Sequence, residues 1–133
     1  MTTEASKFET AMVIDDNIID LYITSRMITK NSFAKNVLHF TAAQQAIQYL
    51  RDNQENAGAL PQIIFIDIYM PLMSGFQFLE EYDKLPDAVK SCCRAYILSS
   101  TIDNQDITRS SGNRNVVSFH VKPITKEVLD RIV

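Results

Sequence analysis

Cysteine is scarce in this chain of 133 residues, and the two that occur, Cys92 and Cys93, are neighbours. Neighbouring cysteines rarely form a disulfide, and the spacing of a four-cysteine zinc site is absent. The N-terminal residues 1–10 are polar and lack the apolar segment of a secretory signal. These features predict a protein of the cytoplasm with two reduced thiols.

Long apolar runs and clustered basic residues are also missing. No apolar run approaches the roughly 20 residues that a membrane-spanning helix needs. The formal net charge is −3, and the longest basic grouping, residues 109–114, is sparse. Because phosphate backbones are bound by clustered positive charge, we expect neither a membrane partner nor direct binding of nucleic acid.

The apolar residues that are present, 46% of the chain, suffice for one buried core, and the length fits one domain. Short apolar runs alternate with segments that have the spacing of amphipathic helices. The runs predict strands at residues 11–14, 36–40, 62–67, 95–99 and 116–121. Residues 1–9 are predicted to be a flexible leader, which leaves residues 10–133 for the domain.

Five helices are predicted between and after these strands. The first is expected to bury one side, composed of Ile18, Leu21, Tyr22 and Ile28. Thr41 is the expected N-cap of the second helix, and Gly58 is a helix stop in the polar loop that follows it. Pro86 is expected to end the third. The fourth, at residues 103–111, has a single large apolar residue, Ile107, and is weakly specified.

Strands alternating with helices imply right-handed βαβ units and a doubly wound parallel sheet. Five strands fit the flavodoxin-like α/β order 2-1-3-4-5. The third run, Ile63-Ile64-Phe65-Ile66, is apolar without alternation, as is typical of a central strand covered on both faces. Ligands of such folds bind beyond the carboxyl ends of the strands, so functional residues are expected directly after each apolar run.

Polar groups occupy those positions. Asp15 and Asp16 follow the first strand and Asp67 ends the third, which is its neighbour in the predicted order. Crowded carboxylates repel one another unless a cation neutralises them, and oxygen ligands of this kind suit Mg²⁺. Ser99 ends the fourth strand, and Lys122 follows the fifth. A carboxylate flanked by a divalent cation, a lysine and a hydroxyl is suited to attack phosphorus and form an aspartyl phosphate.

Each of these features is common by itself. An Asp-Asp pair after a strand usually caps a helix or turn, and a Lys-Pro pair usually forms a surface turn. The informative observation is that all of them occur in this order, each directly after a predicted strand.

With these features, the chain resembles the receiver domains of two-component response regulators from residue 11 to residue 133. The resemblance rests on the motifs Val13-Ile14-Asp15-Asp16-Asn17, Ile66-Asp67-Ile68-Tyr69-Met70-Pro71, Ser74-Gly75, Leu98-Ser99-Ser100 and Val121-Lys122-Pro123. It implies a signalling domain that receives a phosphoryl group on Asp67 from a histidine kinase or a histidine phosphotransfer protein. It implies no enzymatic activity beyond the domain's own phosphorylation and dephosphorylation.

The resemblance also implies roles for single residues. Asp16 would bind Mg²⁺ directly, Asp15 largely through water, and Tyr69 through its backbone carbonyl. Lys122 would pair with the phosphoryl group on Asp67, and the bond between Lys122 and the following proline is expected to be cis.

Two further residues resemble the switch pair of the family. Ser99 would be the hydroxyl that follows the phosphoryl group, in place of the more usual Thr. Phe119 would be the switch aromatic, and because it lacks the hydroxyl of Tyr it would signal by packing alone. The weakly held helix at residues 103–111 would move with them.

Two other functions share parts of this pattern. A phosphohydrolase of the haloacid dehalogenase type also uses an Asp nucleophile, but it usually has a second Asp where this chain has Tyr69. A flavin or nucleotide carrier would need a phosphate-binding loop after the first strand, where Asp15 and Asp16 are electrostatically unsuitable. The sequence ends about one helix after Lys122, so the expected output is a protein contact, a phosphate relay or phosphate storage. A phosphorylation-dependent homodimer is left open.

Overall fold

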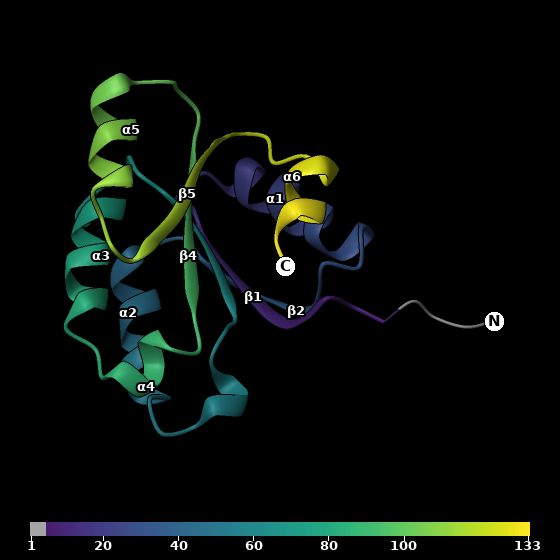
Figure 1. Cartoon of the computed structure of the whole chain (residues 1–133), viewed down its shortest axis with the longest axis vertical. Helices are drawn as coiled ribbons and strands as arrows, with labels where there is room; N and C mark the ends of the chain where they lie inside the picture. Colours follow the sequence, from purple (N-terminus) through teal and green to yellow (C-terminus); the bar gives the residue numbers. More distant parts are fainter. Residues whose placement is uncertain (1–4) are drawn as a thin grey trace.

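The computed structural model describes residues 5–133 and shows a parallel sheet with helices on both faces (Figure 1). The strands are β1 (Phe8–Ile14), β2 (Ala34–Phe40), β3 (Ile63–Asp67), β4 (Arg94–Ser99) and β5 (Val116–Val121). Their order is β2-β1-β3-β4-β5, which confirms the predicted flavodoxin-like topology. The helices are α1 (Ile18–Lys30), α2 (Ala43–Asp52), α3 (Gly75–Asp83), α4 (Asp87–Lys90), α5 (Asn104–Ser111) and α6 (Lys126–Arg131).

The sheet separates two apolar layers. In Figure 1, α2, α3, α4 and α5 lie on one side of the sheet, and α1 and α6 lie on the other. Alternate residues of β3 serve the two layers, because successive side chains of a strand point to opposite faces. Ile64 and Ile66 join the core under α2 and α3, whereas Ile63 and Phe65 join the core under α1 and α6. All five residues of β3 are buried, as predicted for a central strand.

The first strand begins earlier in the sequence than predicted. β1 begins at Phe8, so residues 8 and 9 of the predicted leader belong to a strand. The Lys7 ammonium group donates hydrogen bonds to backbone carbonyls of Leu129 and Ile132 at the end of α6. A cation is favourable there because the last carbonyls of a helix carry partial negative charge. The predicted leader therefore extends at most to residue 6, and residues 1–4 lie outside the described part of the chain.

The prediction for the buried side of α1 is partly wrong. Leu21 and Ile28 are buried as expected, but the side chains of Ile18 and Tyr22 are 71% and 66% exposed. The buried stripe continues instead through two small polar residues, Thr24 and Ser25, at the spacing of one helix face. The Ser25 hydroxyl donates to the carbonyl of Leu21, so its burial leaves no unpaired donor.

Three other local predictions also need correction. α2 begins after Ala42, without the side-chain cap expected from Thr41. Gly58 does not end this helix, since α2 closes at Asp52 and Gly58 lies in a separate short 3₁₀ turn, Ala57–Ala59. Pro86 is followed by the short helix α4, so six α-helices are present among the described residues instead of the five predicted. Pro86 can start this helix because proline suits helix N-termini.

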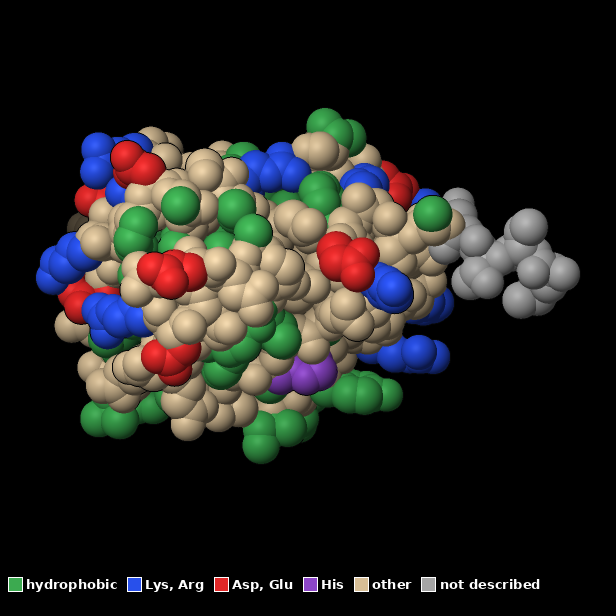
Figure 2. All heavy atoms as spheres, turned by 90° about the horizontal axis from the view of Figure 1, so that it is seen from below, with side chains coloured by type: hydrophobic (Ala, Val, Ile, Leu, Met, Phe, Trp, Pro, Cys, Tyr) green, Lys and Arg blue, Asp and Glu red, His purple; other side chains and the backbone are tan. Residues whose placement is uncertain are grey.

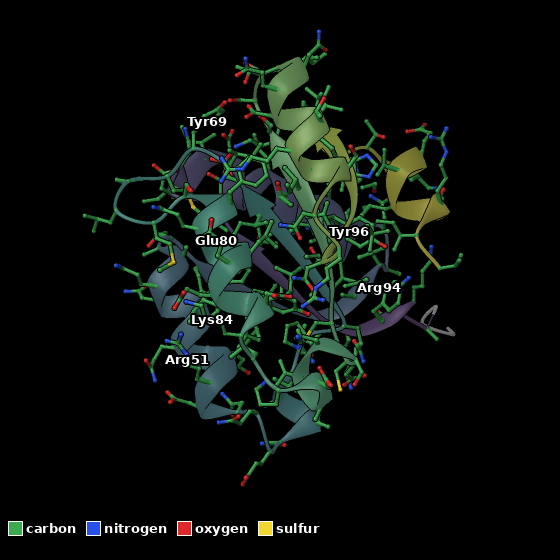
Figure 3. All side chains as sticks on the ribbon, turned by 60° about the vertical axis from the view of Figure 1, so that its left-hand side comes forward. Arg51, Tyr69, Glu80, Lys84, Arg94 and Tyr96 are labelled. Carbon is green, nitrogen blue, oxygen red and sulfur yellow. The ribbon has the colours of Figure 1, made fainter. Side chains whose placement is uncertain are left out.

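Charges on the described surface pair locally. Glu81 on α3 accepts hydrogen bonds from Arg51 on α2 and from Lys84, and Figure 3 labels both of these basic residues. On the face shown in Figure 2, basic side chains are interspersed with acidic ones. Within residues 5–133, no helix has the length and apolar character needed to cross a membrane.

Candidate functional site

The carboxyl ends of four strands meet at one edge of the sheet. Ile14 pairs with Ile66, Asp67 pairs with Leu98, and Ser99 pairs with Val121. This register brings the residue that follows β1, the last residues of β3 and β4, and the residue that follows β5 to the same level. The predicted site residues from separate parts of the sequence are therefore brought together.

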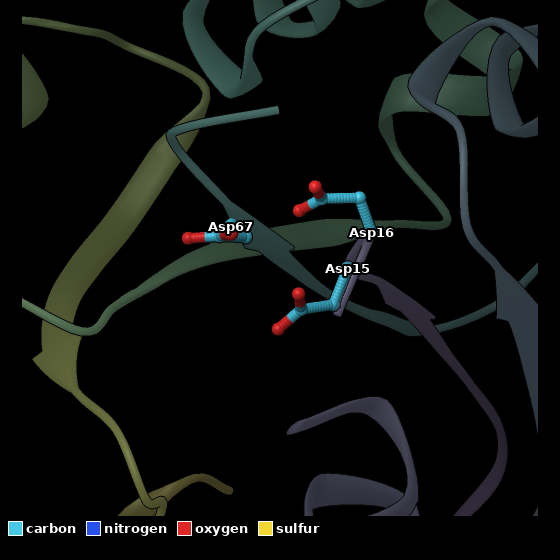
Figure 4. A group of neighbouring side chains, drawn as sticks. All are labelled: Asp15, Asp16 and Asp67. Carbon is cyan, nitrogen blue, oxygen red and sulfur yellow. The ribbon is translucent and has the colours of Figure 1, made fainter. Parts of the chain in front are cut away.

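The three acidic residues expected to bind metal form one cluster. One carboxylate oxygen of each of Asp15, Asp16 and Asp67 lies within 4.8 Å of the others. Figure 4 shows Asp15 and Asp16 at the end of β1, beside Asp67 at the end of β3. Asp15 and Asp67 are buried, with exposures of 3% and 7%, whereas Asp16 is exposed. The cluster thus has two buried carboxylates and one that is exposed to solvent.

The turn between β1 and α1 orients the side chain of Asp15. The backbone N–H of Asn17 donates to Asp15 Oδ1, and the Asn17 side chain accepts from the N–H groups of Ile19 and Asp20. Asn17 is therefore the N-cap of α1, where a side-chain oxygen satisfies free backbone donors. The cap holds Asp15 inward and begins the helix immediately beside the acidic cluster.

Lys122 enters the cluster from the far strand. Its Nζ atom donates to Asp15 Oδ2 at 2.8 Å and to Asp20 Oδ2 at 2.9 Å, and lies 3.7 Å from Asp67 Oδ2. The backbone N–H of Lys122 donates to the carbonyl of Ser99, and the following bond to Pro123 is cis, as predicted. Asp20 is a part of the site that was not predicted from the sequence. Its only sequence signal is an acidic residue in the first turn of a helix, which usually complements the helix dipole.

Electrostatics in the cluster favour an added cation. Burial raises the pKa of Asp67 to about 6, and the negative charges of Asp15 and Asp16 act in the same direction, against the opposing effect of Lys122. Burial also disfavours the charge of Lys122, but its hydrogen bonds to Asp15 and Asp20 outweigh that cost and raise its pKa. One lysine does not balance these carboxylates. Oxygen donors in excess of positive charge are the set that a hard divalent ion takes, so the residues present fit Mg²⁺.

The loop between β3 and α3 contacts α5 through Tyr69. The Tyr69 side chain is 56% exposed, and its hydroxyl donates to a carboxylate oxygen of Asp106 on α5. This hydrogen bond raises the pKa of Tyr69 to about 12. Figure 3 shows Tyr69 in the loop beside α5. A phosphohydrolase of the haloacid dehalogenase type has a general-acid Asp at this position. This chain has Tyr69 there instead, and its hydroxyl donates to Asp106 on α5.

A glycine at the start of α3 lies directly against the end of β3. The N–H of Gly75 donates to the carbonyl of Ile68 at 2.8 Å. A Cβ atom at Gly75 would lie 2.4 Å from the backbone carbonyl oxygen of Asp67, far inside van der Waals contact. Only glycine allows the helix to approach the Asp67 backbone this closely.

The predicted switch residues occupy different environments. Ser99 is fully buried, and its Oγ atom accepts a hydrogen bond from the backbone N–H of Thr101. Phe119 is half-buried against the core under α3. Beside it a cleft of about 330 Å³ runs between α5 and β5, lined in part by Ile107. An aromatic ring that is half-buried next to open space has room to change position.

A family model described as the response regulator receiver domain matches residues 11–133. A response regulator receiver protein from Dyadobacter fermentans is 30% identical, with a TM-score of 0.82 and coverage of 91% of both chains. A two-component response regulator from Cytophaga hutchinsonii is 25% identical, with a TM-score of 0.84 over 92% of this chain and 91% of that chain.

One curated relative is also similar over most of this chain. The probable methanogenesis regulatory protein FilR2 from Methanothrix harundinacea is 24% identical over 92% of this chain and 77% of its own length. At the carboxyl end of the sheet, this chain has an acidic cluster of Asp15, Asp16 and Asp67. The family match over almost the whole sequence, the sheet order and the acidic cluster agree, and the chain belongs to the response regulator receiver family.

Proposed function

We propose that this domain accepts a phosphoryl group on Asp67 from a phosphohistidine of a histidine kinase or a histidine phosphotransfer protein. The observation that carries the proposal is the burial of Asp67 between two further carboxylates and Lys122 at the carboxyl end of the sheet. An Asp67 oxygen would form the new P–O bond while the P–N bond breaks and its electron pair stays on the imidazole ring. The product is an aspartyl phosphate.

Three carboxylates and a carbonyl would hold the required cation. Asp16 would bind Mg²⁺ directly, Asp15 largely through water, and Asp67 and the Tyr69 carbonyl would complete the protein ligands. When bound, Mg²⁺ supplies positive charge that offsets the charge of the phosphoryl oxygens. The geometry of Asp15 favours this role, because the N–H of Asn17 already orients one of its oxygens.

Lys122 would supply the second positive charge. Its side chain is 8% exposed, and its Nζ atom lies within ion-pair distance of Asp67, so the group is surrounded by little water. A charge-assisted hydrogen bond from such a donor to a phosphoryl oxygen is worth about 1.5–3 kcal/mol. Lys122 would therefore stabilise both the transfer and the product.

The output would be a change of protein contacts. A phosphoryl group on Asp67 would attract the Ser99 hydroxyl, and Phe119 would then turn inward and let α5 take a second position. This is a shift between two existing states, and coupling of this kind is typically about 1–3 kcal/mol. The surface formed by α5, β5 and α6 would then bind a partner protein or a second copy of this chain.

Labelling with a small phosphodonor tests the proposal. The wild-type chain, incubated with acetyl phosphate and Mg²⁺, is expected to gain one phosphoryl group by intact mass, and removal of Mg²⁺ should prevent the gain. Asp67→Asn should not be labelled, because an amide is not a competent nucleophile. Glu55→Gln, which removes an exposed carboxylate elsewhere, is the control and should be labelled normally. Normal labelling of Asp67→Asn would refute the proposal.

A further inference from the structure

The strongest unassigned contact in the site is the ion pair between Lys122 and Asp20. We infer that Asp20 is a positioning residue that holds the Lys122 ammonium group away from Asp67 until a phosphoryl group competes for it. The inference rests on the proposed function, since it concerns the lysine that would stabilise the aspartyl phosphate. A residue of α1 would thereby slow the phosphorylation of Asp67.

The distances in the site show where the lysine is held. Lys122 Nζ is within hydrogen-bond distance of Asp15 and Asp20, at 2.8 and 2.9 Å, but 3.7 Å from Asp67. A separation of 3.7 Å is too long for a hydrogen bond. An ammonium group has three donors, and two of them are committed to carboxylates other than the one expected to react.

The two carboxylates that hold Lys122 differ in what they can do later. Asp15 would also interact with the cation, largely through water, so Lys122 would no longer have its charge to itself when the site is loaded. Asp20 lies on α1, outside the acidic cluster of Asp15, Asp16 and Asp67, and its carboxylate forms an ion pair with Lys122. Its backbone is held in place, because its N–H donates to the Asn17 cap. Asp20 is therefore the contact that persists and opposes the approach of Lys122 to Asp67.

Shielding from water makes this competition effective. The Lys122 side chain is 8% exposed and that of Asp20 is 32% exposed, so water competes only partly for the ion pair. Ion pairs in such surroundings are screened less than exposed ones. Removing the charge of Asp20 while keeping its shape should release the lysine toward Asp67 or toward a phosphoryl group on it.

A double-mutant cycle tests this inference. Asp20→Asn keeps the size and an acceptor oxygen, and it is expected to raise the rate of phosphorylation by acetyl phosphate about threefold to tenfold. The same substitution in a Lys122→Ala background should have no effect, because the two residues act through one contact. Glu127→Gln, which removes a charge from the first turn of α6, controls for net charge and should leave the rate unchanged.

A structural readout separates this inference from the proposed function. In a crystal structure of metal-free Asp20→Asn, Lys122 Nζ should lie within about 3.2 Å of an Asp67 oxygen. This measurement does not depend on whether the chain accepts phosphate. If the wild-type chain cannot be labelled but Lys122 has moved to Asp67 in the Asp20→Asn structure, the proposed function is refuted and the role of Asp20 is not. A lysine that stays at its original distance, or an equal rate increase in the Lys122→Ala background, would overturn the role of Asp20.

Discussion

Asp67 has to ionise in a place that disfavours its charge. Burial raises its pKa to about 6, above the ordinary value of 3.8. The folded chain therefore binds this proton more tightly than the unfolded chain does. Stability from this group is present at low pH and is lost as the pH rises from about 4 to about 6. A group that weakens the fold at neutral pH is typical of a site kept for chemistry.

Because ionised Asp67 weakens the fold, removing its charge should stabilise the protein at neutral pH. In metal-free buffer at pH 7, Asp67→Asn is expected to raise the free energy of unfolding by about 1–3 kcal/mol, because an amide avoids the cost of a buried charge. The gain should vanish near pH 4, where wild-type Asp67 is protonated. Urea denaturation across this pH range, with Glu55→Gln as the control, measures it. A variant less stable than wild type at pH 7 would contradict the predicted sign.

Most residues that meet in the candidate site could be predicted from the sequence to lie together. Asp67 and Lys122 each follow a strand, and the topology alone brings such residues together. Asp20 could not be predicted, because it lies inside a helix and its contact depends on how α1 is oriented over the sheet. The bond between Tyr69 and Asp106 was missed for a similar reason, since it joins a loop to a helix more than thirty residues later.

Among the elements, α3 depends on one glycine for its contact with β3. Gly75→Ala is expected to destabilise the fold by about 1–3 kcal/mol, because the added Cβ would overlap the Asp67 carbonyl and displace the backbone. Gly112→Ala is the matched control, since its nearest new contact is an ordinary 3.5 Å, and it should change stability by less than about 0.5 kcal/mol. Thermal unfolding of both variants measures the difference. Equal effects would show that the close approach of Gly75 is not required.

Among the described α-helices, α5 alone buries no apolar residue. Its large apolar residue, Ile107, is 36% exposed, and polar contacts tie the helix to its neighbours. Asp106 accepts from Tyr69, and the Arg109 guanidinium lies 4.1 Å over the Phe76 ring. Helices held by such contacts are able to move at low cost.

Hydrogen exchange tests whether α5 moves with the site. Beryllofluoride, a phosphoryl mimic, is expected to change the protection of residues 103–111 and 116–121, and Asp67→Asn should abolish the change. Ser99→Ala should diminish it, whereas Ser100→Ala, at an exposed neighbouring position, should not. Changes confined to the loops that follow β1 and β3 would show that α5 takes no part in signalling.

The elements also show where sequence patterns succeed and fail. β3 was predicted well because a continuous apolar run between polar loops has few alternatives. The buried side of α1 was predicted less well, because apolar residues outnumber the places on its inner face, and small polar residues fill part of it. The short helix α4 has too few residues to show a periodic pattern, so no sequence signal marks it.

On the scale of the whole molecule, the parallel sheet gathers residues that are more than a hundred positions apart, such as Asp15 and Lys122. Two apolar layers cover the faces of the sheet, and the acidic cluster lies beyond them at its polar edge. The same edge adjoins the loops that lead to α3 and α5 (Figure 1). A charge added at Asp67 is therefore placed where it can bias the less firmly held side of the molecule.

The most direct test is to locate the modified residue chemically. The chain would be treated with acetyl phosphate and Mg²⁺ and then reduced with borohydride, which converts an aspartyl phosphate to homoserine. Peptide mass spectrometry would then identify the changed position. We predict homoserine at residue 67 alone, and none when Mg²⁺ is removed. Homoserine at another aspartate, or no reduction product in a chain that has gained a phosphoryl group, would contradict the assignment of Asp67 as the phosphoacceptor.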